Sequence, residues 1–186
     1  MEPYPPEFID VAADLILRRP TPDDAEDMAA AIAASLEHLQ PWMPWAAAPD
    51  AGAVTAQHGR LADAARAWNS GEEFHYIAAG RDDGAILGRF GLHRRIGPGA
   101  LELGYWLRPN AVGKGYASAC ARALTTVALS LPDVERVEIH CDEANVRSQR
   151  VPRVAGYRLD RIEPDGLQAP ADVGRSMVWV FPPNAM

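Results

Sequence analysis

Short segments rich in aliphatic and aromatic residues recur along the chain, separated by turn-forming residues. Their length, apolar content and boundaries at Gly, Pro, Asn or Asp predict strands. These segments are residues 16–19, 74–80, 85–94, 101–107, 134–142, 157–162 and 177–181. The sequence Arg81-Asp82-Asp83-Gly84 joins the second and third of them and predicts a hairpin turn.

Longer segments between these runs have the spacing of helices. In residues 115–131, apolar side chains repeat at helical intervals, and Pro132 ends the pattern. Capping residues and alanine-rich composition predict three more helices. These cover residues 21–39, 51–68 and 145–155. Strands and helices do not alternate regularly, so the pattern predicts a mixed α/β (α+β) domain rather than a succession of βαβ units.

The domain organisation is expected to be simple. Pro3, Pro5 and Pro6 predict an irregular N-terminal arm over residues 1–14. The remainder, residues 15–186, is predicted to be a single domain, because a chain of 186 residues has room for about one.

Composition and charge exclude several classes of protein. The formal net charge of −7, without a run of Lys or Arg, argues against a nucleic-acid partner. No stretch approaches the roughly 18 apolar residues of a membrane span, and the N-terminus lacks the basic and apolar regions of a signal peptide. We therefore expect a cytoplasmic protein with no membrane partner, as a monomer or homodimer. Cys120 and Cys141 suggest neither a disulfide framework nor a metal site, and both are expected to be reduced and buried.

A glycine-containing turn before a helix is the first feature that suggests chemistry. The strand over 101–107 is followed by Gly113 and Gly115, and a helix then begins. Free N–H groups at a helix N-terminus, approached closely through glycine, form a cradle for an anion such as a pyrophosphate. A glycine turn that binds no ligand is equally consistent with this segment. The spacing does not fit the P-loop, and Ser118 stands where the dinucleotide fingerprint requires its third glycine.

The second feature lies about 30 residues further on. Asn145 is a natural N-cap, and it places the hydroxyl of Ser148 in the first turn of the following helix. Pro152 falls inside that helix, where it removes the hydrogen bond to the Ser148 carbonyl and should bend or loosen the helix there. The alternative is a capped helix with a surface serine.

Together the two features resemble a known family. The residues GYWLRPNAVGKGYASACARAL and HCDEANVRSQRVPRVAGYRL are similar to the acetyl-CoA-binding core of the GNAT N-acetyltransferases. The resemblance is strongest to the RimJ/RimL-like branch, which acetylates ribosomal-protein N-termini, and covers roughly residues 15–181. SLEHLQPWMPW resembles the tryptophan-bearing loop of that branch. Val112 departs from the family motif, which has Arg or Gln at this place.

The resemblance implies a central, mostly antiparallel mixed sheet that splays between residues 101–107 and 134–142. It also implies direct transfer of an acetyl group from acetyl-CoA, as cosubstrate, to a primary amine, without a metal. The implied acid for the leaving thiolate is Ser148. For the base, or a water relay to it, the candidate is Glu102 of the 101–107 strand, and it comes from the residues rather than from the resemblance. The implied cofactor contacts are Trp106, Leu107, Val112, Gly113, Lys114, Gly115, Tyr116, Ala117, Asn145 and Ser148, with backbone N–H at the end of the 101–107 strand polarising the thioester carbonyl.

The base remains open at this point. Glu102 shares a strand face with Gly104 and Trp106, and burial would raise its pKa toward a useful value. The alternative is that Glu102 pairs with a neighbouring arginine, such as Arg89 or Arg94. His75 and His93 are weaker candidates for the base.

The acceptor is the least determined part. Trp42 and Trp45 are expected to wall the acceptor pocket together with Glu102, although packing in the core would explain the tryptophans nearly as well. Acidic residues at the start of the first helix predict a field that attracts a protonated amine. We expect a peptide or protein α-amino group, with small-molecule amines or lysine side chains as alternatives. A non-catalytic acyl-CoA-binding or sensing domain is the rival from another class.

Overall fold

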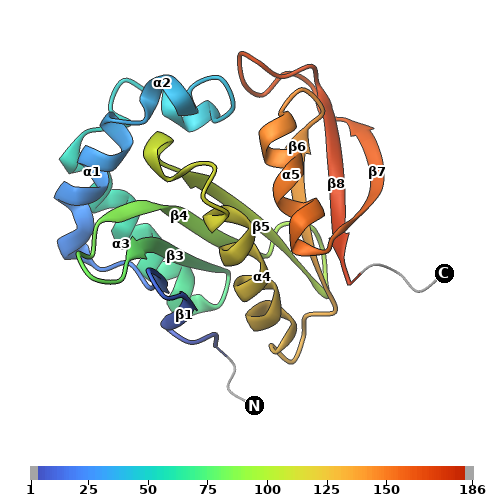
Figure 1. The fold of residues 1–186 in the computed structure, drawn as a ribbon, viewed down its shortest axis with the longest axis horizontal. Coiled ribbons are helices and arrows are strands. Elements are labelled where there is room, and N and C mark those ends of the chain that lie inside the picture. Colours follow the sequence, from blue (N-terminus) through green and yellow to red (C-terminus); the bar gives the residue numbers. More distant parts are fainter. Residues whose placement is uncertain (1–3, 183–186) are drawn as a thin grey trace.

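A computed structural model describes residues 4–182 of the chain (Figure 1). Residues 1–3 of the expected arm and 183–186 of the expected domain lie outside the described residues. Eight strands form one sheet in the order β1-β2-β3-β4-β5-β6-β8-β7, antiparallel throughout except between β5 and β6. The strands are β1 (Phe8–Ala12), β2 (Leu15–Arg18), β3 (Glu73–Gly80), β4 (Ile86–His93), β5 (Ala100–Leu107), β6 (Arg136–Asp142), β7 (Arg158–Pro164) and β8 (Arg175–Phe181).

The helices follow the predicted pattern closely. They are α1 (Ala25–Ala33), α2 (Leu36–Leu39), α3 (Val54–Ser70), α4 (Tyr116–Leu129) and α5 (Val146–Ala155), with short 3-10 turns at Pro22–Asp24, Pro44–Ala47 and Pro109–Ala111. The helix expected over residues 21–39 is interrupted between α1 and α2. The buried hydroxyl of Ser35 donates to the Ala31 carbonyl at 2.7 Å at this break, as a serine that competes for backbone hydrogen bonds can do.

The expected irregular arm is wrong for residues 8–12. These residues form β1, which pairs with β2 at the edge of the sheet. Ile9 and Val11 alternate with exposed neighbours and pack against the core. Phe8, Ile9 and Val11 are residues that favour strands, but the preceding prolines suggested an irregular segment instead.

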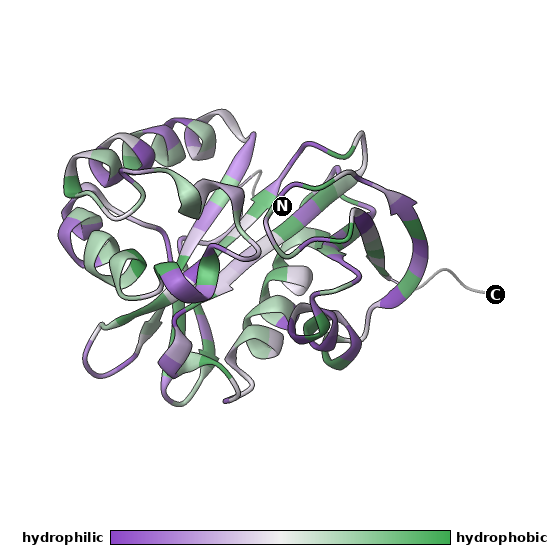
Figure 2. Cartoon of the chain, turned by 90° about the horizontal axis from the view of Figure 1, so that it is seen from above, coloured by the Kyte–Doolittle hydropathy of each residue, from purple (hydrophilic) through white to green (hydrophobic). Residues whose placement is uncertain are grey.

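Two apolar clusters hold the helices on opposite faces of the sheet. Side chains of α4, such as Cys120 and Leu124, pack with Phe90 and Leu103 of the sheet. Side chains of α1 belong to the second cluster, which includes Trp106. At the far edge of the sheet, β7 is mostly hydrophilic (Figure 2), a composition that discourages pairing with another chain.

The sheet splays where the resemblance implied that it would. β5 pairs with β6 at three successive positions, from Ala100 opposite Arg136 to Glu102 opposite Glu138. Beyond Glu102 the two strands diverge (Figure 1), and β6 continues in its pairing with β8. The second half of β5 is therefore an edge strand in the middle of the sheet. No helix in residues 4–182 is long and apolar enough to cross a membrane.

Candidate active site

A cavity of about 740 Å³ occupies the gap between the diverging strands. Its lining includes Glu102, Gly104 and Trp106 from one face of β5, and Leu103 and Tyr105 from the other. Successive side chains point to opposite faces of a strand, so the cavity passes through the plane of the sheet. It can do so because, among the described strands, β5 has no partner on this side beyond Glu102.

Two glycines face each other on the floor of this cavity. Gly91 of β4 is opposite Gly104 of β5, in a register that also places His93 opposite Glu102 and Arg89 opposite Trp106. The imidazole of His93 covers the glycine pair. A Cβ at Gly91 would lie 2.6 Å from His93 Nε2, and one at Gly104 would lie 3.6 Å from it.

The start of α5 brings Ser148 to the cavity. Asn145 caps the helix as predicted, because its side chain accepts a hydrogen bond from the Ser148 N–H at 3.1 Å. Pro152 lies inside α5 and leaves the Ser148 carbonyl without its helical partner. The Tyr105 hydroxyl, 3.1 Å from the Ser148 Oγ, donates to that carbonyl at 3.3 Å. Because Pro152 leaves the Ser148 carbonyl free, Tyr105 can bind it, and this contact connects α5 with β5.

Glu102 lies at the point where the strands separate, and its partner is Arg95, not the expected Arg89 or Arg94. Arg95 donates two hydrogen bonds to the Glu102 carboxylate, at 2.7 and 2.6 Å. Burial would raise the pKa of Glu102, but the Arg95 guanidinium outweighs burial and holds this pKa below its ordinary value of 4.5. The expectation of a raised pKa is thus wrong.

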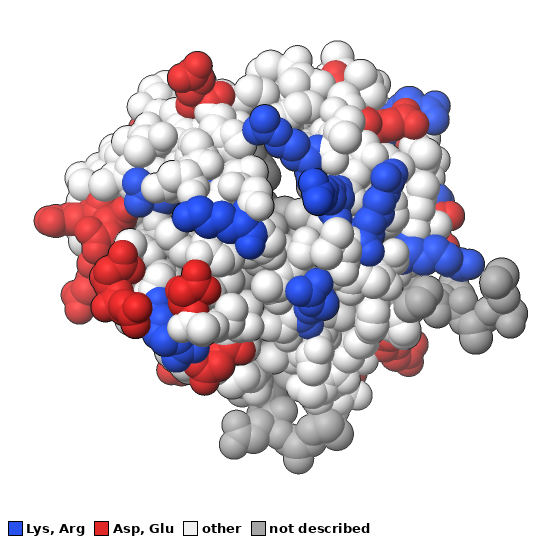
Figure 3. Space-filling model, in the orientation of Figure 1, with Lys and Arg blue, Asp and Glu red and all other residues white. Residues whose placement is uncertain are grey.

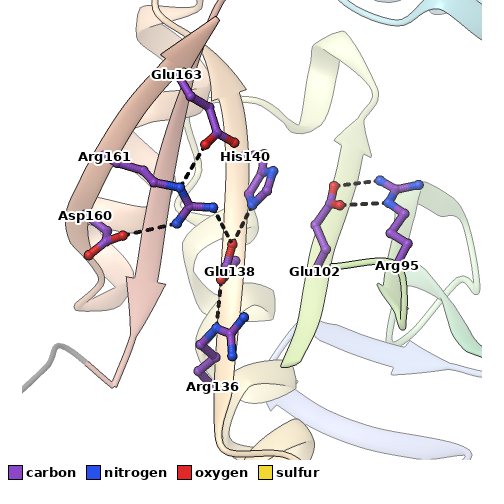
Figure 4. A network of polar contacts seen from close by, with 8 residues as sticks. All are labelled: Arg95, Glu102, Arg136, Glu138, His140, Asp160, Arg161 and Glu163. Carbon is purple, nitrogen blue, oxygen red and sulfur yellow. Dashed lines mark hydrogen bonds and ion pairs between the residues drawn. The ribbon is translucent and has the colours of Figure 1, made fainter. Parts of the chain in front are cut away.

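A second carboxylate, Glu138, stands beside Glu102 in the register of the sheet (Figure 4). Its side chain is 2% exposed, and three basic groups surround it. Arg136 Nε and His140 Nε2 each lie 2.8 Å from its oxygens, and Arg161 lies at 3.7 Å. Burial favours a higher pKa for Glu138, but these contacts lower it below 4.5. The negative charges of the two adjacent carboxylates are thus compensated separately. Arg95 pairs with Glu102, and the three basic groups named above surround Glu138.

The splayed strand also presents free backbone donors. The N–H of Arg108 donates to the Leu87 carbonyl, toward β4. Donor direction alternates along an antiparallel strand, so the N–H groups of Tyr105 and Leu107 face the gap and that of Trp106 faces β4. The N–H groups of Tyr105 and Leu107 are therefore the ones in position to polarise a carbonyl in the gap, as the sequence predicts for this strand. The N–H of Trp106 is not, but Trp106 lines the cavity.

The predicted cradle lies at the N-terminus of α4. Gly113 and Gly115 both have a φ of +83°, which favours glycine, and a Cβ at either would meet no atom within 4 Å. Within the described chain, no hydrogen bond engages the N–H of Gly113, Lys114 or Gly115. Val112 is 38% exposed beside them. These free donors, together with the first-turn N–H groups of Tyr116 and Ala117, form a surface that can receive an anion.

Basic side chains concentrate on the same side of the molecule. Lys and Arg surround the hollow at the centre of the face in Figure 3, and Asp and Glu gather to its left, over the region of α1. Within the described residues, none of the acidic side chains at the start of α1 lines the cavity. Asp24 is instead paired with Arg18. The expectation that these carboxylates steer the acceptor amine is therefore not supported by their position.

The two tryptophans of the loop before α3 line the cavity from the α1 side of the sheet. Trp42 and Trp45 belong to its wall, as does their neighbour Met43. Trp45 also packs against Trp106, with ring centroids 6.1 Å apart. The structure thus combines the two roles considered for Trp45, because it packs on the second apolar cluster and also faces the cavity.

Glu73, His75 and His93 form a polar cluster next to the glycine pair. Glu73 Oε2 lies 2.8 Å from His75 Nε2, and Glu73 Oε1 lies 2.9 Å from His93 Nδ1. Burial and the charge of Arg89 lower the pKa of His75 to about 4. Three potential metal ligands lie together here, but the Arg89 guanidinium that affects His75 also disfavours a divalent cation. The cluster instead orients His93, whose Nε2 lies over Gly104.

Several residues of the cavity were not predicted from the sequence. Tyr105 lies beside the predicted Glu102 and Trp106, and its place in the same strand was the available signal. Arg95 follows the end of β4, and nothing in the sequence marks it as the partner of Glu102. Cys141 was expected only in the core, but it also lines the cavity. Burial raises the pKa of its thiol to about 11.

A sheet that splays beside a helix-terminal cradle defines a class of protein, and comparison with known families agrees. Residues 14–158 match the family described as the acetyltransferase (GNAT) domain. The chain therefore belongs to the GNAT acetyltransferases, and it is an acetyl-CoA-dependent N-acetyltransferase.

Individual relatives agree with this assignment. The chain is 30% identical over 156 residues to the Bacillus subtilis (strain 168) protein named "Putative ribosomal N-acetyltransferase YdaF", with 82% of each chain covered. The microcin C7 self-immunity acetyltransferase MccE, solved with acetyl-CoA and AMP, has a TM-score of 0.85 at 16% identity, covering 96% of this chain and 97% of that one. RimL, named as a ribosomal L7/L12 alpha-N-protein acetyltransferase and solved with coenzyme A, has a TM-score of 0.84 at 20% identity, covering 94% and 97%.

The network around Glu138 yields a prediction about stability. Replacing Glu138 with Gln leaves Arg136 and Arg161 without their shared buried carboxylate, and we expect the free energy of unfolding to fall by about 1–2 kcal/mol at pH 7. Glu163→Gln is the matched control. It removes a half-exposed partner of Arg161 and should change the unfolding free energy by less than about 1 kcal/mol.

The measurement is urea unfolding at a series of pH values. The folded-state pKa of Glu138 is depressed, so its contribution is complete above its ordinary value of 4.5 and is lost as the pH falls through the folded value. The difference between wild type and Glu138→Gln should therefore shrink below pH 4.5. Equal effects of the two substitutions at pH 7 would contradict the proposed importance of the buried network.

Proposed function

We propose that the chain acetylates the α-amino group of a peptide or protein. The observation that carries this proposal is the cavity that passes through the splayed sheet. One side lies at the start of α5, where Asn145 and Ser148 line the cavity, and a phosphate-bearing cofactor would approach from that side. The other side lies under the tryptophan loop, where an acceptor can enter. A thioester and an amine that enter from opposite faces would meet beside β5.

The names of relatives favour a protein acceptor over a small molecule. YdaF is named as a ribosomal N-acetyltransferase, and RimL as an alpha-N-protein acetyltransferase. The cavity is open enough to admit the end of a chain, and Trp42 and Trp45 offer apolar surface to the first residues of a peptide. Small amines and lysine side chains are the alternative acceptors.

The proposed reaction is direct attack of the amine on the thioester carbonyl. Backbone N–H groups of Tyr105 and Leu107 would polarise the carbonyl as negative charge develops on its oxygen. Glycines 113 and 115 and the start of α4 would hold the pyrophosphate of the cofactor. Asn145 would fix the first turn of α5, and Ser148 would donate its proton to the departing thiolate. Tyr105, at 3.1 Å from the Ser148 Oγ, would hold that hydroxyl in place.

The proton acceptor has two candidates in the cavity. We propose Glu102, acting through ordered water, because it lies at the point where the strands separate. Its lowered pKa keeps it ionised at neutral pH but makes it a weaker base. His93 is the alternative, because its Nε2 lies over Gly104 and its Nδ1 faces Glu73. Substitution of each residue in turn separates the two candidates.

The cradle is tested by a bulky substitution at Gly115. Gly115→Leu should obstruct the anion-binding surface and weaken acetyl-CoA binding by tenfold or more in calorimetry, equivalent to at least about 1.4 kcal/mol. Gly84→Leu is a matched control, because Gly84 also has a positive φ, of +66°, and open space around it, but lies in the β3–β4 turn. We expect Gly84→Leu to introduce similar backbone strain and to leave the affinity for acetyl-CoA unchanged. Unchanged acetyl-CoA binding by folded Gly115→Leu would contradict the assignment.

Catalytic roles are tested by Ser148→Ala and Glu102→Gln. Ser148→Ala should lower kcat by roughly 10²-fold, with little change in cofactor affinity, because a general acid acts on the transition state. Glu102→Gln should lower kcat and remove an acidic limb of the kcat/KM profile that lies below pH 4.5, since the Glu102 pKa is depressed. If Glu102→Gln keeps most of its activity and His93→Gln does not, His93 is the base instead.

The tryptophan loop is tested by Trp42→Ala in bisubstrate kinetics. Because Trp42 lines the acceptor side of the cavity, we expect KM for a peptide acceptor to rise and KM for acetyl-CoA to stay within about twofold. A denaturation curve for the variant serves as the control for folding. If both KM values are unchanged, the acceptor does not contact this loop.

A further inference from the structure

Arg89 is a charged residue of this cavity that has no ion-pair partner among the described residues. It lies on β4 between Ile77 of β3 and Trp106 of β5, and its side chain lines the cavity. Its Nε is buried without a hydrogen-bond partner. Among the described residues, no carboxylate forms an ion pair with its guanidinium and no hydrogen bond from it is made.

The other cations of the cavity have partners. Arg95 binds Glu102 through two hydrogen bonds. Arg60 donates to the Ala51 carbonyl at 2.9 Å and lies 3.8 Å from Asp50. Glu73 is the acidic group that acts on Arg89 at a distance, but its two oxygens are engaged by His75 and His93. Residues 4–182 thus supply no direct counter-ion for Arg89.

Arg89 nevertheless remains charged. Burial lowers its pKa to about 10, and Arg60 adds to this effect, so the guanidinium is still protonated at neutral pH. Arg89 is half-buried, and an unpaired charge that has lost part of its hydration is costly. A fixed guanidinium is also the side chain best shaped to bind a planar carboxylate through two parallel hydrogen bonds. The position of Arg89 is therefore explained by a ligand that brings the missing anion.

A second unpartnered group lies at the wall of the same cavity. Gln57 of α3 is completely buried, and its amide nitrogen donates to the Ala51 carbonyl at 2.7 Å. Its Oε1 accepts no hydrogen bond within the described chain. Because Gln57 has no exposed surface, its amide packs behind the cavity wall, and Arg89 is the unpartnered group that can contact a ligand.

We propose that the acceptor carries a carboxylate close to its amine, and that Arg89 binds this carboxylate. The inference rests on the proposed function and narrows its substrate class. The carboxylate would come from an Asp or Glu side chain near the N-terminus of a peptide, or from the α-carboxylate of a free amino acid. Arg89 then acts as a specificity determinant and not in the chemical step.

The experiment compares matched acceptors. Peptides beginning Ser-Asp and Ser-Asn differ by one charge at nearly constant shape, and free serine tests the α-carboxylate as the source. We expect kcat/KM for wild type to favour Ser-Asp over Ser-Asn, or serine over serine amide, by tenfold or more. In Arg89→Gln this preference should fall to within twofold, while KM for acetyl-CoA stays within about threefold.

Two variants separate recognition from structure. Arg89→Lys keeps the charge and should retain part of the preference. Arg94→Gln is the matched control, because Arg94 follows the same strand and pairs with Asp133 instead of lining the cavity, and it should preserve the full preference. An equal loss of activity toward charged and neutral acceptors in Arg89→Gln, or no preference in wild type, would overturn the proposal.

Calorimetry distinguishes this proposal from the proposed function. CoA without its acetyl group is bound first, and the Ser-Asp and Ser-Asn peptides, serine and serine amide are then titrated without turnover. Binding of an acidic ligand that depends on Arg89, without acetylation of that ligand, would support the anion site and contradict the assigned acceptor. Acetylation of neutral peptides with no dependence on Arg89 would support the proposed function and contradict the anion site.

Discussion

The missing strand partner of β5 beyond Glu102 is the constraint on which the site depends. An interior strand normally has both edges hydrogen-bonded and both faces covered. Here β6 turns away to follow β8, so one edge of β5 is free over its second half. That edge supplies backbone donors, lets a cavity cross the sheet, and places side chains from both faces of one strand in one space. Without the splay, the same residues would be separated by the sheet.

Charge compensation around the splay is the second determinant of the site. Glu102 and Glu138 stand side by side, and each is held by its own basic partners (Figure 4). Their pKa values consequently lie below the ordinary range. Arg89 is the exception to this compensation. The paired carboxylates of Glu102 and Glu138 stabilise the strands that carry them. The unpaired guanidinium of Arg89 is instead the group that we propose binds a ligand.

The sequence predicted much of the fold because its signals are local. Strand runs, the cap at Asn145, the glycines at 113 and 115 and the proline within α5 depend on neighbouring residues, and the structure confirms all of them. The resemblance extended this to the splay, since a family pattern carries information on pairing that no single run contains. β1 was missed because a short strand after prolines gives a weak local signal.

Partnerships between side chains were decided only by the tertiary structure. Glu102 pairs with Arg95, although Arg89 on the adjacent strand seemed equally available, because register and the path of the chain after β4 bring Arg95 within 2.7 Å. The depressed pKa of Glu102 follows from that contact and could not follow from composition. Tertiary structure also decides three other features of the site. They are the contact of Tyr105 with Ser148, the position of the His93 ring over two glycines, and the unpaired state of Arg89. Each depends on distances between segments far apart in sequence, and the packing of the sheet and its helices determines those distances.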